Sequence, residues 1–199
     1  MNPMADFKPF NIAFSIDPLS FEPKEEIILR KLSTMKGAFA DQPSADAMLA
    51  HGEDPKIVEV YMAPIPHSEG FLMANINVVY PGKIGDEYFM TKGHIHDDPQ
   101  HAPEIYITIK GQGKLLMQNM AGEYSLLDMA EGIINYIPAP YAHRCINTGS
   151  QPLVYLGIFP ADTERDYSFD SKNFKKLVIE RDGQVALVDN PLAAKESLL

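Results

Sequence analysis

The sequence predicts an all-β protein, an antiparallel barrel-like sandwich with an N-terminal extension. From residue 57 onward, short runs rich in Val, Ile, Tyr and Phe are separated by closely spaced turns containing Gly, Pro or Asn. No helical period interrupts these runs, which disfavours the alternation of strands and helices that builds parallel sheets. A strand rhythm of this kind is typical of antiparallel sandwiches and barrels.

The first 56 residues have a different texture, and we expect them to form an arm that packs on the barrel. Proline recurs through their first part, and no period is sustained there. A short helix is predicted at 44–50, with Ser44 as its N-cap and Gly52 just past its end. The segment RKLSTMKGAF at 30–39 does not decide between helix and strand.

The following domain is predicted to span residues 57–190, with 191–199 as a C-terminal tail. Its clearest hairpin is KLVIERDGQVALV at 176–188, where Asp182 and Gly183 can adopt the positive φ angles of a two-residue turn. The other strands are predicted at 57–65, 71–80, 87–92, 104–109, 114–120, 124–128, 133–137, 142–147 and 153–159.

The charge and composition of the chain argue against nucleic acids and membranes as partners. The chain has 17 Lys and Arg against 27 Asp and Glu, a formal charge of −10, so it lacks the basic surface that nucleic acids and anionic membranes require. Its one cysteine excludes an internal disulfide and fits a reducing compartment. There is no pattern of a signal peptide, and the apolar runs are too short to span a bilayer. We therefore expect a cytoplasmic protein with no nucleic-acid or membrane partner.

A group of histidines and acids interrupts the strand pattern in TKGHIHDDPQHAPEIYITIKGQG, residues 91–113. Residues i and i+2 of a strand share a face, so His94 and His96 project side by side. Glu104 opens the next predicted strand, and His143 lies on a later one. Each residue alone has an ordinary interpretation, as a solvated loop histidine, a core histidine or a strand-edge charge. Together, three imidazoles and a carboxylate suit one divalent transition-metal ion.

The spacing of these residues resembles the two sequence motifs of cupins, which are small β-barrels. The first motif is matched by His94, His96, Glu104 and, after six intervening residues, Gly111. The second is matched by Gly132, five residues, Pro138, then His143, three residues, Asn147, with Pro140 where glycine is usual. The resemblance implies a cupin fold whose inner face carries the metal site.

Longer blocks resemble the cupin-type glucose-6-phosphate isomerases, first recognised in archaea. The blocks RKLSTMKGAFAD, VVYPGKIGDEYFMTKGHIH, EIYITIKGQG, PLVYLGIFPAD, RDYSF and VALVDNP follow in that family's order from about Arg30 to Pro191. The resemblance implies interconversion of glucose 6-phosphate and fructose 6-phosphate, with one divalent ion per subunit held by His94, His96, Glu104 and His143. Iron is the expected ion, with manganese, nickel or zinc as alternatives, and a homodimer is the expected assembly.

The same resemblance assigns the catalytic and substrate-binding residues. Glu104 is expected as the base, with Tyr106 beside it; whether hydrogen moves as a proton or as a hydride stays open. The residues expected to bind the sugar phosphate are Asn77, Lys92, Gly93, Tyr106, Phe159, Arg165 and Tyr167.

Several positions depart from the family pattern. Asn77 replaces a threonine, Phe159 a tyrosine and Arg165 a histidine, and Arg165 could compensate because a guanidinium binds phosphate bidentately. The segment between His96 and Glu104 is one residue longer than expected and contains His101, an extra candidate ligand. These departures leave two alternatives open, a cupin dioxygenase acting on another substrate and a sugar-phosphate-binding cupin without turnover. Cys145 is predicted to be a small buried hydrophobe.

Overall fold

The computed structural model describes residues 7–24, 26–96, 102–167 and 173–193. These residues form, in chain order, β1 (Ala13–Ile16), β2 (Leu19–Glu22), β3 (Glu26–Lys31), α1 (Leu32–Met35), a 3-10 turn (Lys36–Ala38), α2 (Gln42–Ala50), β4 (Lys56–Met62), β5 (Leu72–Val79), β6 (Lys83–Ile84), β7 (Glu87–Tyr88), β8 (Ile95–His96), β9 (Glu104–Lys110), β10 (Gln112–Asn119), β11 (Tyr124–Ala130), β12 (Ile134–Ile137), β13 (Tyr141–Ile146), β14 (Leu153–Pro160), β15 (Arg165–Asp166), β16 (Lys176–Arg181) and β17 (Gln184–Asp189). The all-β prediction is confirmed.

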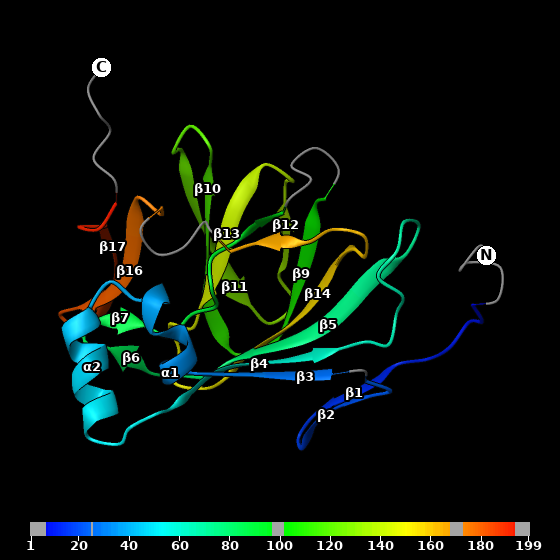
Figure 1. The fold of residues 1–199 in the computed structure, drawn as a ribbon, viewed down its shortest axis with the longest axis horizontal. Coiled ribbons are helices and arrows are strands. Elements are labelled where there is room, and N and C mark those ends of the chain that lie inside the picture. Colours follow the sequence, from blue (N-terminus) through cyan, green and yellow to red (C-terminus); the bar gives the residue numbers. More distant parts are fainter. Residues whose placement is uncertain (1–6, 25, 97–101, 168–172, 194–199) are drawn as a thin grey trace.

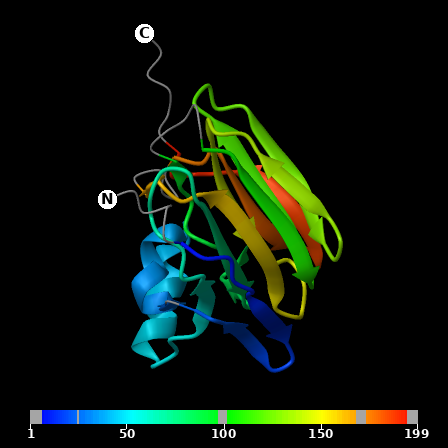
Figure 2. The same cartoon turned by 90° about the vertical axis from the view of Figure 1, so that its right-hand side faces the viewer.

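The strands assemble into antiparallel sheets that enclose one main core (Figures 1 and 2). The largest sheet has the order β12-β9-β14-β5-β4-β3, and a three-stranded sheet has the order β11-β10-β13. A third sheet, β17-β16-β7-β6, lies beside α1 and α2 (Figure 1). Side chains from all three sheets, including Met73, Leu115 and Val178, are buried in the core between them. This closed arrangement is the cupin barrel that the motifs predict.

The N-terminal segment contributes directly to the largest sheet. β3 pairs with β4 from Glu26 opposite Met62 to Lys31 opposite Lys56, so hydrogen bonding crosses the boundary predicted at residue 56. The β1–β2 hairpin lies on the outer face of the same sheet, where Phe21 packs in a smaller apolar cluster with Ile76 and Val154. The chain before residue 57 therefore includes strands that the sequence pattern did not identify.

The residues at the β16–β17 turn and at the start of α2 explain why one local prediction is right and the other wrong. Asp182 and Gly183 have φ angles of 52° and 73°, which confirms the predicted hairpin of β16 and β17. The prediction for the helix start is wrong. α2 begins at Gln42, and its N-cap is Asp41, whose carboxylate accepts a hydrogen bond from the Ser44 backbone N–H. Aspartate is as good an N-cap as serine, and a proline within the first helical turn moves the start two residues earlier.

The strand predicted at 87–92 is shorter than expected. Only Glu87–Tyr88 pair as β7, and Met90 makes an isolated bridge with Ile146. The chain between β7 and β8 instead runs along β13, so that the His94 N–H and C=O groups pair with those of His143. This pairing fixes the backbones of two predicted metal ligands side by side.

Candidate metal centre and active site

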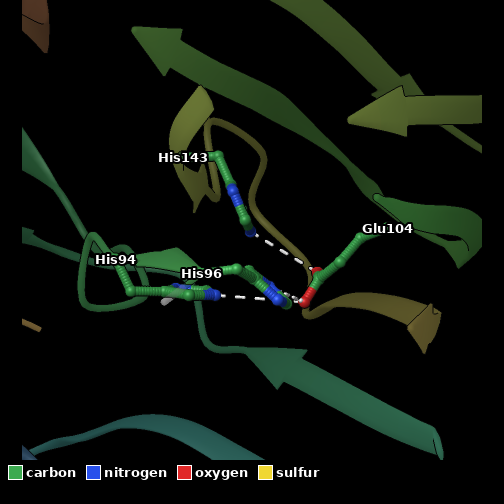
Figure 3. A group of neighbouring side chains, drawn as sticks. All are labelled: His94, His96, Glu104 and His143. Carbon is green, nitrogen blue, oxygen red and sulfur yellow. Dashed lines mark hydrogen bonds and ion pairs between the residues drawn. The ribbon is translucent and has the colours of Figure 1, made fainter. Parts of the chain in front are cut away.

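The four predicted ligands meet inside the barrel (Figure 3). Three neighbouring segments supply them: His94 and His96 at β8, Glu104 at the start of β9, and His143 on β13. All four side chains are buried, and one ligand atom from each lies within 4.8 Å of the others. Segments far apart in the sequence thus bring three imidazoles and one carboxylate to a single point, as the strand spacing predicts.

Glu104 is at the centre of this group. Its Oε1 lies 2.6 Å from His96 Nε2 and 4.0 Å from His94 Nε2, and its Oε2 lies 3.4 Å from His143 Nε2. Burial raises the pKa of this carboxyl, and hydrogen bonds donated by the three imidazoles lower it well below its ordinary value; a cation between them would act in the same direction when the inward ring nitrogens carry no proton. Glu104 is therefore an anion inside the barrel, close to all three histidines.

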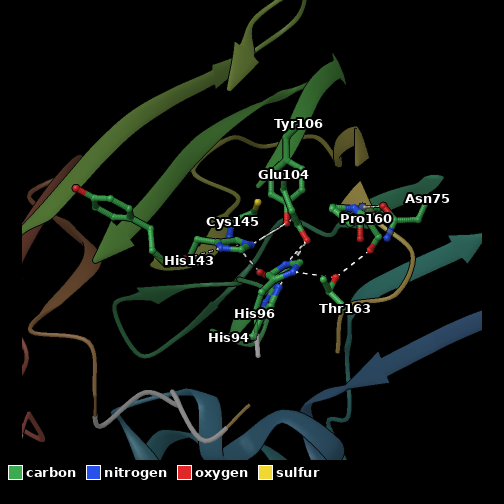
Figure 4. A network of polar contacts seen from close by, with 12 residues as sticks. Asn75, His94, His96, Glu104, Tyr106, His143, Cys145, Pro160 and Thr163 are labelled. Atoms are coloured by element: carbon green, nitrogen blue, oxygen red, sulfur yellow. Dashed lines mark hydrogen bonds and ion pairs between the residues drawn. The ribbon is translucent and has the colours of Figure 1, made fainter. Parts of the chain in front are cut away.

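The outer hydrogen bonds of two histidines indicate which ring nitrogens face inward (Figure 4). His143 Nδ1 lies 3.1 Å from the Tyr141 carbonyl, which can only accept, so Nδ1 carries the proton. Thr163 Oγ1 donates to the Pro160 carbonyl at 2.9 Å and is thus free to accept from His96 Nδ1 at 3.2 Å. Both Nε2 atoms consequently present lone pairs to Glu104.

These lone pairs need a cation between them. His96 Nε2 and Glu104 Oε1 are both acceptors in this tautomer, yet they are 2.6 Å apart. Two further buried atoms, His94 Nε2 and Glu104 Oε2, have no hydrogen-bond partner among the described residues. Buried polar atoms are normally satisfied, so unpartnered acceptors converging on one point fit a bound ion. The donor set of three imidazoles and one carboxylate suits a divalent transition metal.

Tyr106 lies against this group. Its hydroxyl is 3.1 Å from His143 Nε2, and its ring packs on Tyr155 at a centroid distance of 4.7 Å. Burial, with the nearby charge of Glu104, raises the pKa of Tyr106 well above its ordinary value, so the phenol is a neutral donor. The prediction that Tyr106 shares the face of Glu104 is confirmed.

A glycine on β14 provides the space for this ring. A Cβ atom at Gly157 would lie 2.5 Å from Asn75 Oδ1 and 3.3 Å from Cε1 of Tyr106. Asn75 Oδ1 also accepts a hydrogen bond from Asn77 Nδ2 at 2.6 Å. Gly157 therefore leaves the space next to the backbone of β14 that the side chains of Asn75, Asn77 and Tyr106 occupy.

A cavity opens beside the metal centre, and most of the predicted substrate-binding residues line it. Its lining residues are Ile28, Arg30, Val58, Val60, Asn75, Asn77, Thr91, Lys92, His94, Tyr106, Tyr155, Arg165 and Tyr167. An adjoining cavity of about 220 Å³ shares Lys92 and Tyr167 with the first and is also lined by Gly93. Asn77, Lys92, Gly93, Arg165 and Tyr167 thus meet at two connected hollows.

Phe159 is placed differently from the other predicted residues. It is buried and is not among the residues that line either cavity. Its ring lies 6.2 Å from that of His96, and the Arg165 guanidinium stacks on it at 4.5 Å. Phe159 therefore supports a ligand and a cavity cation from behind. Two useful residues were missed: Thr163 belongs to no motif, and Arg30 lies in a segment that showed no clear period.

Two other predictions concern residues near the site. Cys145 is fully buried, and burial raises the pKa of its thiol, which confirms that it is a packed hydrophobe. His101 lies outside the described residues.

Comparison with known proteins gives a consistent family. The family model described as glucose-6-phosphate isomerase (GPI) matches residues 29–189. The chain is 45% identical over 170 residues to the glucose-6-phosphate isomerase of Thermococcus kodakarensis, covering 85% of this chain and 88% of the relative. It is 42% identical over 185 residues to that of Thermococcus gammatolerans, covering 92% and 96%. Bacillus subtilis oxalate decarboxylase, a solved structure, gives a TM-score of 0.45 at 24% identity, over 54% of this chain and 27% of that chain.

Proposed function

Because the chain belongs to the cupin-type glucose-6-phosphate isomerase family, it interconverts glucose 6-phosphate and fructose 6-phosphate, and we propose the following roles for its residues in that reaction. The observation that carries the assignment of roles is the convergence of unpartnered Nε2 and carboxylate atoms beside the cavity. The isomerisation moves one hydrogen between C2 and C1 of the open-chain sugar and one hydroxyl proton between O2 and O1.

His94, His96, Glu104 and His143 would hold one divalent ion per subunit. Iron is the ion that we expect, with manganese, nickel or zinc as alternatives, because such a donor set binds all of them and availability selects among them. The ion, when bound, acts as a Lewis acid that stabilises negative charge developing on the sugar oxygens. With these four protein ligands, an ion held here would still be able to bind substrate oxygens.

Glu104 is the proposed base. Its Oε2 has no hydrogen-bond partner among the described residues and so can take the proton from C2 and return it to C1. The neutral Tyr106 hydroxyl, 3.1 Å from His143 Nε2, can donate to a substrate oxygen at the same place. If hydrogen instead moves as a hydride, Glu104 acts only as a ligand. Both routes use the same residues.

The cavity residues would bind the rest of the sugar phosphate. Asn77 supplies an amide where the family has a hydroxyl, and Lys92 and Arg165 supply positive charge. Gly93 offers a backbone N–H at the adjoining cavity, and Tyr167 offers a hydroxyl between the two cavities. Phe159 would act through Arg165, whose guanidinium it supports.

A homodimer in the cytoplasm completes the proposal. Ile134 and Tyr136 on the outer strand β12 are 64% and 59% exposed, and Ile105, the neighbour of Tyr136 across the ladder, is also exposed. A second copy could cover this apolar area.

Among the described helices, none is long and apolar enough to cross a membrane. The charge of −10 supports the absence of a nucleic-acid partner.

A coupled assay on chelator-stripped protein tests these roles. Fructose 6-phosphate is supplied with Fe²⁺, Mn²⁺, Ni²⁺ or Zn²⁺, and glucose 6-phosphate is detected with a dehydrogenase that reduces a nicotinamide. We expect metal-dependent turnover that is lost in Glu104→Gln and retained in Glu53→Gln, which changes an exposed carboxylate after α2. Full activity of the stripped protein, or of Glu104→Gln, would contradict the proposed roles. Oxygen consumption without isomerisation would indicate a dioxygenase.

A further inference from the structure

We infer that Arg30, on β3 of the N-terminal segment, binds the phosphate group of the substrate and determines the preference for phosphorylated sugars. The inference rests on the proposed function, which supplies a substrate with a phosphate at the end of the sugar chain opposite to the reacting carbons. Four features of the structure lead to it: the position of Arg30 on β3, the charges that line the cavity, the contacts of its guanidinium and its place relative to the metal centre.

β3 turns Arg30 toward the cavity. Ile28 and Arg30 alternate onto the face that lines it, whereas Ile27 and Leu29 lie on the other face and are 47% and 43% exposed. The β3–β4 register shifts between Arg30 and Lys31, where Ile57 of β4 is skipped, as in a β-bulge on the partner strand. Bulges bend a strand and re-aim the side chains beside them, and they are common next to active sites.

The cavity is positively charged in a protein that is acidic overall. The chain carries a formal charge of −10, yet the lining residues include Arg30, Lys92 and Arg165, and no Asp or Glu is among the described lining residues. A hollow lined by charges of one sign concentrates that field and attracts the opposite ion. The cavity as a whole therefore favours an anionic ligand.

The guanidinium of Arg30 has no acidic partner among the described residues. Among the described residues, the ion pairs of the protein do not include Arg30 or Lys92. Arg30 Nη2 instead donates to the Tyr167 hydroxyl at 3.2 Å, and Arg30 and Lys92 lie 5.4 and 5.9 Å from the centroid of the same ring. Two cations around one neutral phenol leave most of their hydrogen-bond donors available to an anion.

The position of Tyr167 shows that Arg30 lies away from the reacting end of the substrate. Its ring centroid is 5.6 Å from that of His94, and its hydroxyl reaches Arg30. A tyrosine side chain thus separates the metal centre from the guanidinium. A sugar whose C1 and C2 lie at the metal centre extends its C6 phosphate away from it, toward Arg30 and Lys92. Arg165 is the cavity cation nearer the reacting end, because it pairs with His96 in the β15–β8 ladder.

Arginine suits this role because its planar fork forms two parallel hydrogen bonds to a phosphate. Hydrogen bonds to charged groups contribute more than neutral ones, so loss of the fork weakens binding of a phosphate by about tenfold or more. Because the phosphate takes no part in the chemical step, this loss appears in substrate binding rather than in turnover.

The test uses full-length, metal-loaded protein and three variants. Arg30→Gln removes the charge, Arg30→Lys keeps it without the fork, and Arg181→Gln removes an exposed arginine near the turn between β16 and β17. Two readouts are taken: the KM and kcat for fructose 6-phosphate, and the Kd of inorganic phosphate by titration calorimetry. For Arg30→Gln we expect KM and Kd to rise about tenfold or more with kcat within about threefold of the unchanged protein. Arg30→Lys should be intermediate, and Arg181→Gln should resemble the unchanged protein.

Two results would overturn the inference: phosphate binding that is equal in Arg30→Gln and the unchanged protein, or an equal loss in Arg181→Gln. The two readouts separate this inference from the proposed function. If the unchanged protein fails to isomerise fructose 6-phosphate but binds phosphate through Arg30, the inference stands and the proposed function fails. If it isomerises the substrate with no dependence of KM or Kd on Arg30, the inference fails and the proposed function stands.

Discussion

His143 and Arg144 are consecutive residues of β13, both only 1% exposed, and they bury their polar groups on opposite sides of the strand. His143 points into the barrel toward Glu104, at 3.4 Å. Arg144 lies on the opposite face of the strand, stacks on Phe174 at 4.3 Å and donates from Nη2 to the Lys176 carbonyl at 3.1 Å. One strand thus supports two buried ionisable clusters with different contacts.

The two clusters differ in how their buried hydrogen-bond donors and acceptors are paired. Around His143, acceptor atoms converge on one point while protonated ring nitrogens are anchored outside it. Around Arg144, a donor faces a carbonyl and an aromatic ring, and the buried carboxylate of Glu87 accepts from the Ala40 N–H at 2.8 Å. Burial lowers the pKa of Arg144 to about 10, although Glu87 acts in the opposite direction. Glu87 Oε1 and Arg144 Nε also lack a hydrogen-bond partner among the described residues, but they are one acceptor and one donor. The functional site is distinguished by several acceptors that converge on one point.

The largest expected effect is on the inner cluster, which consists of His94, His96, Glu104 and His143. His143→Ala removes one ligand, and we expect loss of stoichiometric metal binding and a fall in kcat/KM of about a thousandfold or more, since several kcal/mol of stabilisation are lost. Metal content by elemental analysis and turnover in the coupled assay measure this. Stoichiometric metal with near-normal turnover in His143→Ala would remove the distinction between the clusters.

The matching substitution in the cluster of Arg144, Glu87 and Phe174, here called the outer cluster, should lower the stability of the fold instead of metal binding. Arg144→Ala leaves Glu87 buried without a compensating charge and empties the space over Phe174, so we expect the free energy of unfolding to fall by about 3–5 kcal/mol. Urea unfolding of metal-free protein measures it, and the folded fraction should keep its metal affinity. Arg144→Met, which retains packing on Phe174, is the control and should lose less. A folded Arg144→Ala protein that no longer binds metal would contradict the separation of roles.

A smaller effect is expected outside the ligands, at the hydroxyl that orients one of them. Thr163→Val removes the acceptor for His96 Nδ1–H, and we expect metal affinity to fall by about 10- to 100-fold, as for other partners of ligating histidines. Competition with a chelator measures the affinity. Thr163→Ser keeps the hydroxyl and should bind metal as the unchanged protein does; equal losses in both variants would exclude this hydrogen bond as the cause.

The smallest expected effect concerns pH and Glu87. Burial raises the pKa of Glu87 above its ordinary 4.5, despite the opposing charge of Arg144. The folded state therefore binds this proton more tightly than the unfolded state does, and its stabilising contribution is lost as pH rises through the folded pKa. We expect the free energy of unfolding of the unchanged protein, relative to Glu87→Gln, to decrease as pH rises above about 4.5. Urea titrations of both proteins across that range measure it, and an increase would give the opposite sign.

The sequence predicts the inner cluster far better than its surroundings. His94, His96, Glu104 and His143 could be identified because strand alternation and motif spacing place them on one face. Thr163 could not, because its bond to His96 depends on how the chain turns between β14 and β15. A hydroxyl in a loop has no periodic pattern.

Arg30 shows a second limit of sequence reasoning. β3 is six residues long and leads directly into α1, so its alternation is too short to distinguish from a helical turn. The bulge beside Arg30 also depends on its pairing with β4, a contact between segments that are distant in the sequence. The burial of Arg144 likewise could not be predicted from the sequence, because a cationic side chain on a strand is normally solvent-exposed.

Gly157 limits how the substrate range of this protein can evolve. Any side chain there would overlap Asn75 and press on Tyr106, which line the cavity beside the metal centre and form what we call its floor, so we expect substitutions at this position to reduce activity before they alter specificity. The part of the cavity around Tyr167 is less constrained, because Arg30 and Lys92 each contact the Tyr167 ring through a long, flexible side chain, and Tyr167 is itself partly exposed. New substrates are therefore accessible by mutation of this part of the cavity, at the end of the sugar far from the metal centre, while the floor preserves the isomerisation chemistry.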